Sequence, residues 1–149
     1  MNTTSRTHES IAVGVDGSLC SHAALRWAIQ HARAGDRVTL VHAWEPSPST
    51  SSSGLVSSED DSGAHHLVQH ELARAGNLTP AKGVELSCEV LHGDPRRMLC
   101  DYRADLIVIG AGGHGPLAAA VLGSVSAHLA RHCTVPLVLV PQNRPRRIS

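Results

Sequence analysis

Apolar residues along this chain follow two alternating patterns. Short runs rich in branched aliphatic residues are typical of buried strands, and they fall at residues 11–16, 37–44, 84–91, 105–110 and 135–140. Between the runs, apolar residues recur at intervals of three and four, which is typical of helices packed by one face. The first such stretch has its apolar positions at Leu25, Ala28, Ile29 and Ala32. The pattern therefore predicts strands and helices in strict alternation.

Local signals predict where these helices begin and end. Ser18 precedes the first helical stretch as an N-cap, and Gly35 is its predicted stop. A second helix is predicted over 64–77. Asp94-Pro95 has the form of an N-cap followed by proline at the first helical position, and that helix is predicted to run to Ala104. A last helix is predicted to open near Ser124.

Strand and helix alternation predicts an α/β fold, in which an open five-stranded parallel sheet carries helices on both faces. Sheets of this kind bind ligands beyond the carboxyl ends of the strands, at the point where the winding reverses. If the winding reverses between the first and fourth strands, Asp16 and Gly110 both lie at that crevice. The hydrophobic pattern alone leaves the strand order open.

The length of 149 residues predicts one domain, 1–149. Residues 1–9 and 142–149 are predicted to be flexible tails, and the serine-rich stretch 45–63 a flexible loop. No run approaches the ~20 apolar residues needed to span a bilayer, so no membrane contact and a cytoplasmic location are expected. The cysteines form no C-x-x-C pair, which argues against a zinc or redox motif.

The charges are distributed unevenly although the formal net charge is zero. All 13 acidic residues precede position 106, and the remainder of the chain has four arginines. This asymmetry is either a solvated basic tail around Arg144, Arg146 and Arg147 or the low carboxylate density that an anion site needs. Four arginines in a neutral protein give little counterion release on nucleic acid, so no nucleic-acid partner is expected.

The glycine-rich segment 110–126 follows the fourth predicted strand directly, and two common phosphate-binding motifs do not explain it. Gly110, Gly112 and Gly115 satisfy G-x-G-x-x-G, but they follow the wrong strand and no acidic residue lies downstream to hold a ribose. A P-loop requires a lysine within the motif, whereas the single lysine of this chain is Lys82.

A third pattern matches by position: G-x-x-G, nine residues, then G-S, at Gly110, Gly113, Gly123 and Ser124. Glycines allow main-chain amides to approach an anion, and a helix beginning at Ser124 adds unpaired N–H groups and a positive dipole end. At this pattern the chain resembles the universal stress protein family. The same resemblance extends from Ile11 to Val140 and includes Asp16, Val41-His42-Ala43, His92-Gly93-Asp94-Pro95 and Val135-Pro136.

The resemblance implies a Rossmann-like sheet of order 3-2-1-4-5, of the kind shared with adenine nucleotide alpha hydrolases. It also implies a regulatory protein of the stress response that binds ATP and Mg²⁺ and forms a homodimer through its last strand. Asp16 would lie near the ribose and the metal, and Ala43 would offer its backbone to adenine. The full implied site is Gly14, Val15, Asp16, Ala43, Gly93, Ile109, Gly110, Gly112, Gly113, Gly123, Ser124, Val125 and Ser126.

One departure from the family pattern affects the phosphates. Gly112 stands where many ATP-binding relatives have His or Arg, so a side-chain contact is lost unless His114 replaces it. Simpler interpretations also stay open: Asp16 as a turn residue, the glycines as a bare turn, and Ser124 as a helix cap. The histidines at 65, 66, 70, 128 and 132 are interpreted as solvated imidazoles and not as a structural metal site.

Two alternative functions accompany the ATP-binding hypothesis. One is a nucleotide-free dimeric module for protein interactions, and the other is a slow ATPase. The sequence contains no G-x-S-x-G elbow, and Ser124 has no evident general base. Hydrolysis would therefore depend on a metal at Asp16 and a well-placed water.

Overall fold

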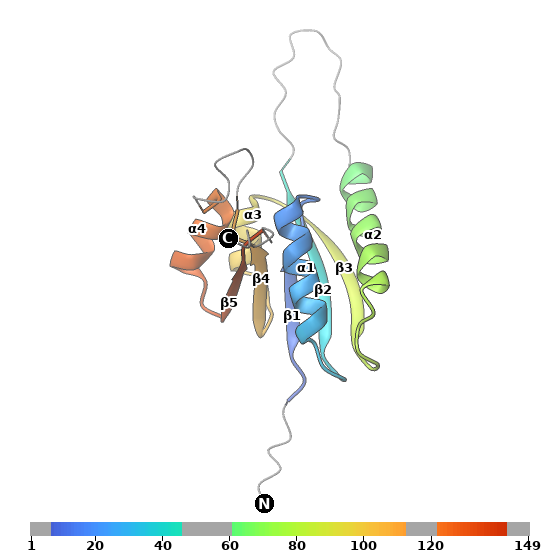
Figure 1. The fold of residues 1–149 in the computed structure, drawn as a ribbon. Helices are drawn as coiled ribbons and strands as arrows, with labels where there is room; N and C mark the ends of the chain where they lie inside the picture. Colours follow the sequence, from blue (N-terminus) through green and yellow to red (C-terminus); the bar gives the residue numbers. More distant parts are fainter. Residues whose placement is uncertain (1–6, 46–60, 113–121, 143–149) are drawn as a thin grey trace, which may run out of the picture.

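The computed structural model describes residues 7–45, 61–112 and 122–142, and these form a sheet with helices on both sides (Figure 1). Strands and helices alternate along the chain, as the sequence pattern predicts. In chain order the elements are β1 (Ser10–Gly14), α1 (Leu19–His31), β2 (Arg37–Trp44), α2 (Asp61–Asn77), β3 (Glu85–His92), α3 (Pro95–Cys100), β4 (Leu106–Gly110), α4 (Ser124–His132) and β5 (Leu137–Val140).

The five strands form one parallel sheet of order β3-β2-β1-β4-β5, which confirms the predicted fold class and strand order. β1 lies at the centre, between β2 and β4. The chain builds outward from β1 to β3 and then crosses back to place β4 on the other side of β1. The winding therefore reverses between β1 and β4, so the crevice expected at such a reversal lies at the carboxyl ends of these two strands.

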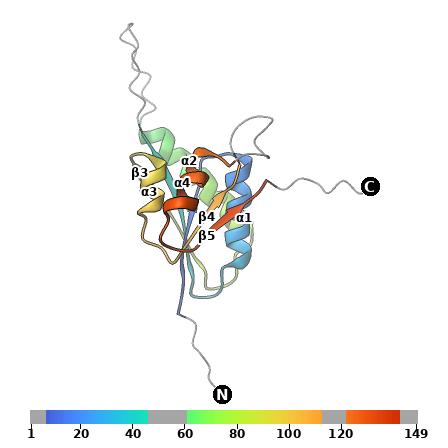
Figure 2. The same ribbon diagram turned by 90° about the vertical axis from the view of Figure 1, so that its left-hand side faces the viewer.

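Helices cover both faces of the sheet (Figure 2), and the buried apolar residues form two separate clusters. α1 and α2 cover one face, where Leu25, Leu40 and Val68 are fully buried or nearly so. α3 and α4 cover the other, where Leu99, Ile107 and Leu129 pack together. Burial on both faces explains why the strands are almost continuously apolar.

The first helix begins where the sequence predicts and ends earlier. The Ser18 hydroxyl accepts the Ser21 N–H at 3.1 Å, which confirms the N-cap. The helix ends at His31 and not at Gly35, because the buried Asp36 carboxylate draws the chain into a turn by accepting the amides of Arg33 and Glu9, each at 2.9 Å. Gly35 occupies that turn with φ +91°.

The third helix also starts as predicted and stops short. The Asp94 side chain accepts the Arg96 N–H at 3.0 Å, and Pro95 is the first helical residue. The helix ends at Cys100 instead of Ala104. The chain turns away there, because the Tyr102 hydroxyl donates to the Glu89 carboxylate at 2.6 Å. Beyond this point Asp105 is bonded to Ser10, which starts β4 beside β1.

Other boundaries shift by a few residues. α2 begins at Asp61, so the predicted loop 45–63 is helical in its last three residues, and its residues 46–60 lie outside the described structure. β1 ends at Gly14 and β5 begins at Leu137, which shortens both predicted strands. Among the described residues, no helix is both long enough and apolar enough to span a bilayer.

Candidate functional site

A cavity of about 220 Å³ opens at the carboxyl ends of β1 and β4, where the winding of the sheet reverses. Its walls come from segments far apart in the sequence: the ends of β1, β2 and β4 and the starts of α1, α3 and α4. Most of the residues predicted from the sequence line it, namely Gly14, Val15, Asp16, Ala43, Ile109, Gly110, Gly112, Gly123, Ser124, Val125 and Ser126.

One described residue of the predicted site, Gly93, is not among those that line the cavity. Gly93 turns the chain between β3 and α3 with φ +145°, and its N–H donates to the Trp44 carbonyl at 2.9 Å. Its role in the structure is therefore that of a turn residue. Gly113 lies outside the described residues, as does His114.

The turn that follows β1 presents Asp16 at the cavity wall. The Asp16 carboxylate accepts the Ser18 N–H at 2.9 Å, and the Asp16 amide donates to the Ser21 hydroxyl at 3.3 Å. Gly17 completes the turn with φ +80°. Asp16 thus has the turn role that the simpler interpretation assigned to it, and its side chain is also exposed at the cavity.

The first turn of α4 supplies backbone donors on the opposite wall. The N-cap is Gly123, not Ser124, and its lack of a side chain leaves the helix without a capping hydrogen bond. The first intrahelical bond runs from the Ala127 N–H to the Gly123 carbonyl at 2.9 Å. Within the described residues, no acceptor pairs with the N–H groups of Ser124, Val125 and Ser126. These three amides lie at the positive end of the helix dipole.

Ser126 contributes to this site through its main chain rather than its hydroxyl. The residue is buried, and its Oγ lies 3.0 Å from the Gly123 carbonyl and 3.4 Å from the Ala111 carbonyl. Both carbonyls can only accept, so the hydroxyl proton is engaged inside the protein. Ser124, by contrast, is exposed at the cavity rim and has room for a side-chain contact.

The glycines at the strand ends also serve close packing, a role that was not predicted from the sequence. A Cβ on Gly110 would lie 2.7 Å from the carbonyl carbon of Cys20, and one on Gly14 would lie 2.9 Å from Cγ2 of Ile109. The Ala111 and Gly123 amides are already bonded, to the Val140 and Ala111 carbonyls at 2.9 and 3.4 Å. Neither of these two amides is therefore available to an anion, whereas the first three amides of α4 are unpaired within the described residues.

The third wall is the end of β2, tied to the turn after β1. The Val15 N–H donates to the Val41 carbonyl at 2.9 Å, and His42 Nδ1 lies 2.7 Å from the Val15 carbonyl. Because a carbonyl only accepts, Nδ1 carries the proton in this contact. Ala43, the residue that the family resemblance places at adenine, follows directly and is buried.

Sequence reasoning missed several lining residues: Ser18, Cys20, Ser21, Val41, His42, Pro95 and Leu99. The missed residues of α1 and β2 lie close in sequence to predicted site residues. Their position at a strand end or a helix start could therefore have indicated that they line the cavity. Pro95 belongs to the family-like motif at residues 92–95, which was also a signal. Leu99 had none, because α3 reaches the cavity through its packing against the sheet and α4.

Two electrostatic features line the cavity: the carboxylate of Asp16 and the N-terminus of α4. Asp16 is the acidic residue among those that line it, and the lining contains no Lys or Arg in the described part of the chain. The described residues also contain no group of three His, Cys, Asp or Glu that would hold a metal unaided. A Mg²⁺ ion commonly takes one or two carboxylates together with substrate phosphates, so Asp16 fits the protein's share of such a site.

Comparison with known proteins assigns the chain to a family. The sequence profile of the Universal stress protein family matches residues 7–141. The chain belongs to the universal stress protein family. Universal stress protein Rv1996 of Mycobacterium tuberculosis is 30% identical over 162 aligned positions, which cover 95% of this chain and 51% of that protein. The chain thus spans about half the length of the curated relatives it matches.

Solved structures of the family share the architecture. One is a universal stress protein in complex with cAMP, with a TM-score of 0.64 and 24% identity over 93% of this chain and 100% of that one. Another is an Arabidopsis thaliana family member with AMP bound, with a TM-score of 0.61 and 18% identity over 93% and 96% of the two chains. At these identities the likeness concerns the fold.

Proposed function

We propose that this universal stress protein binds an adenine nucleotide in the cavity, with its phosphates at the first turn of α4. The observation that carries the proposal is the row of three N–H groups, of Ser124, Val125 and Ser126, with no acceptor among the described residues. A helix N-terminus with unpaired amides favours an anion by both hydrogen bonding and dipole. The cAMP and AMP bound by two structural neighbours support the nucleotide class.

The ligand we propose is ATP with Mg²⁺. Asp16 faces the cavity from the turn after β1 and is the protein's carboxylate for the ion, while Ala43 and the end of β2 receive the base. The ion would neutralise phosphate charge where the cavity itself has no Lys or Arg among its described lining residues. The proposed site also includes Gly93 and Gly113, because the family resemblance implies that both contact the nucleotide.

The proposed role is regulatory: a cytoplasmic protein of the stress response whose nucleotide occupancy alters its conformation and its partners. Walls from six segments meet at the cavity, so a bound nucleotide would contact elements that lie far apart in the sequence. Any hydrolysis would depend on a water placed by a metal at Asp16, which predicts slow turnover at most.

The direct experiment is to identify what the purified protein holds. The protein is denatured, released material is measured at 260 nm, and the nucleotide is identified by chromatography. Protein freed of ligand is then titrated by calorimetry with ATP, AMP and cAMP, with and without Mg²⁺. Saturable binding of an adenine nucleotide is expected. If no adenine nucleotide binds at millimolar concentration, the proposal is wrong.

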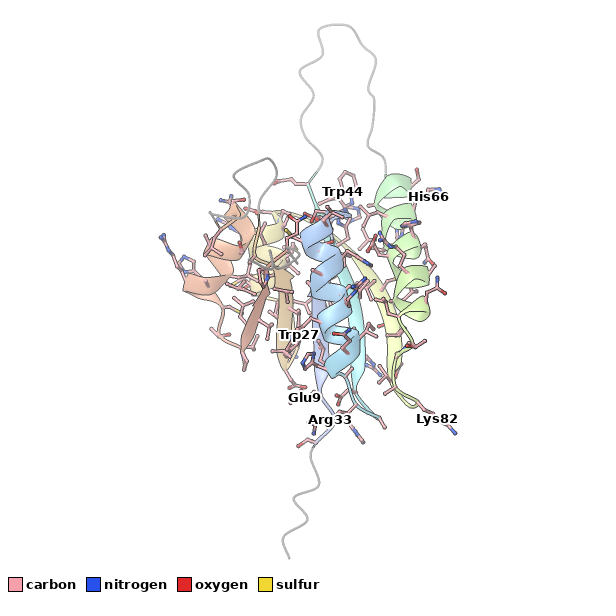
Figure 3. All side chains as sticks on the ribbon, in the orientation of Figure 1. Glu9, Trp27, Arg33, Trp44, His66 and Lys82 are labelled. Atoms are coloured by element: carbon pink, nitrogen blue, oxygen red, sulfur yellow. The ribbon has the colours of Figure 1, made fainter. Side chains whose placement is uncertain are left out.

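The Asp16→Asn variant distinguishes the contribution of the metal to ATP binding from that of the nucleotide itself. The amide keeps an oxygen that can accept the Ser18 N–H, so the turn is expected to survive, whereas the charge is lost. We expect Mg²⁺ to strengthen ATP binding to the parent protein and to have little effect on this variant. Binding of metal-free ATP should be equal or stronger, since a negative charge is removed. Trp44, at the end of β2 beside the site (Figure 3), provides a fluorescence signal once Trp27 is replaced by Phe.

We also propose a homodimer through β5. This strand lies at the edge of the sheet, and its four apolar residues are only half-buried in the single chain. The carbonyls of Pro136 and Val140 point to β4, so by strand alternation the Leu139 amide and carbonyl point outward, where a second copy could pair. Light scattering at micromolar concentration should give twice the 15.7 kDa of one chain. A monomer would overturn this arrangement.

A further inference from the structure

Two histidines of α4 lie side by side on successive turns. His128 and His132 are four residues apart, and their ring centroids are 4.5 Å apart with the planes inclined at 42°. Residues at this spacing share one face of a helix. Within the described residues, neither ring has a hydrogen-bond or ion-pair partner. His132 is exposed and His128 half-buried, so both are reachable from solvent.

We propose that His128 and His132 together chelate one divalent transition-metal ion. An ion that binds two imidazoles at about 2.0–2.1 Å holds the two nitrogens roughly 3 Å apart, a bite that neighbouring rings on one helix face can supply. Imidazole is a ligand suited to zinc, copper and nickel. His132 also lies in the last turn of α4, where the negative end of the helix dipole favours a cation.

The other histidines with described contacts are less suited to this role. His31 is stacked on Trp27 and its Nδ1 is bonded to the Trp27 carbonyl, and His42 Nδ1 is bonded to Val15. On α2, His66 and His70 have the same spacing as the α4 pair, but His70 Nδ1 lies 3.6 Å from the Glu71 carboxylate. The α2 pair is therefore the natural control for the α4 pair.

The ion would have open coordination positions. The described residues supply no third His, Cys, Asp or Glu to the pair, so water or an exogenous ligand completes the coordination. Arg131, in the same last turn, adds a positive charge that opposes the cation. The affinity is therefore expected to be lower than that of a closed structural zinc site. Because the pair spans one turn of a nine-residue helix, binding also stabilises the folded state.

The test uses the full chain without an affinity tag, because a polyhistidine tag would itself bind the ions. Ni²⁺ and Zn²⁺ are titrated by calorimetry into the parent, into His128→Ala/His132→Ala, and into the α2 control His66→Ala/His70→Ala. Figure 3 places His66 on α2, on the other side of the sheet from α4. We expect one ion per chain in the parent and in the control, and roughly a tenfold or greater loss of affinity in the α4 variant.

Thermal unfolding gives a second readout. Ni²⁺ should raise the unfolding temperature of the parent and of the α2 control and leave that of the α4 variant unchanged. The proposal is overturned if the α4 variant binds as tightly as the parent, or if the loss occurs in the α2 variant instead. Neither histidine is among the described residues that line the cavity, so ATP affinity of the α4 variant is expected to be unchanged whether or not the nucleotide proposal holds.

Discussion

Replacing Gly110 by alanine is expected to lower the free energy of unfolding by about 1–3 kcal/mol, the usual cost of forcing one extra carbon into a packed interior. The added Cβ would lie 2.7 Å from both the carbonyl carbon and the Cβ of Cys20, and 2.8 Å from its carbonyl oxygen. Backbone atoms cannot turn aside as a flexible side chain can. The start of α1 must therefore move away from the end of β4.

The same displacement should disturb the cavity. Cys20 follows the N-cap of α1, and Ser18 and Ser21 hold the Asp16 turn by hydrogen bonds. A shift of α1 against β4 thus alters the wall that carries Asp16. We expect nucleotide affinity to fall along with stability, whereas a glycine that served only as a spacer would tolerate a methyl group.

Urea denaturation of the Gly110→Ala protein, with Gly76→Ala as the matched control, checks this prediction. Gly76 lies in α2 with nothing within 4 Å of an added Cβ, so alanine there should raise stability by up to about 1 kcal/mol through its helical preference. The two variants are thus expected to shift the midpoint in opposite directions at similar slope. If the midpoint of Gly110→Ala is equal to or above that of the parent, α1 can move away without loss of folding free energy and the prediction is wrong.

Features encoded by neighbouring residues could be predicted from the sequence. Ser18 and Asp94 cap their helices because a side chain reaches an amide two or three residues away, and such contacts need no knowledge of the rest of the fold. The buried strands could also be predicted, because both faces of the sheet are covered and each strand is therefore an almost continuous apolar run. The strand order followed from the family resemblance, because an apolar run does not specify its neighbour.

Features that depend on distant segments were predicted less well. α3 ends early because Tyr102 reaches Glu89 on another strand, and α1 ends early because Asp36 binds the amide of Glu9. The packing role of Gly110 was missed for the same reason: its partner, Cys20, lies 90 residues away. The glycine pattern selected residues that line the cavity, whereas the packing of each glycine depends on contacts that only the folded chain reveals.

These contacts change how the proposed phosphate site works. Gly110 allows α1 and Gly14 allows Leu99 of α3 to approach the sheet. The unpaired amides on which the proposal rests belong to the uncapped first turn of α4. A side-chain cap on Gly123 would satisfy one of these amides, so a glycine at the N-cap keeps all of them available to a ligand. The site therefore depends on backbone dipoles, which are most sensitive to a charge placed among them.

Ser124→Asp introduces such a charge, and we expect it to reduce ATP affinity about tenfold or more, which is at least about 1.4 kcal/mol of binding free energy. The carboxylate would stand beside the amides of Val125 and Ser126 and repel the phosphates. Stability should not fall, because an acidic residue in the first turn interacts favourably with the helix dipole and Ser124 is exposed. Calorimetric titration and urea denaturation of the same preparation measure the two effects.

Two controls assign the effect to charge at this helix. Ser124→Asn has nearly the same shape as the aspartate without its charge and is expected to keep most of the affinity. Ser62→Asp adds the same charge to the first turn of α2, which does not line the cavity, and should leave binding unchanged. If Ser124→Asp binds ATP as tightly as the parent, the phosphates lie elsewhere and the α4 amides are not their site. If Ser124→Asn loses as much affinity as Ser124→Asp, the hydroxyl rather than the dipole is the decisive contact.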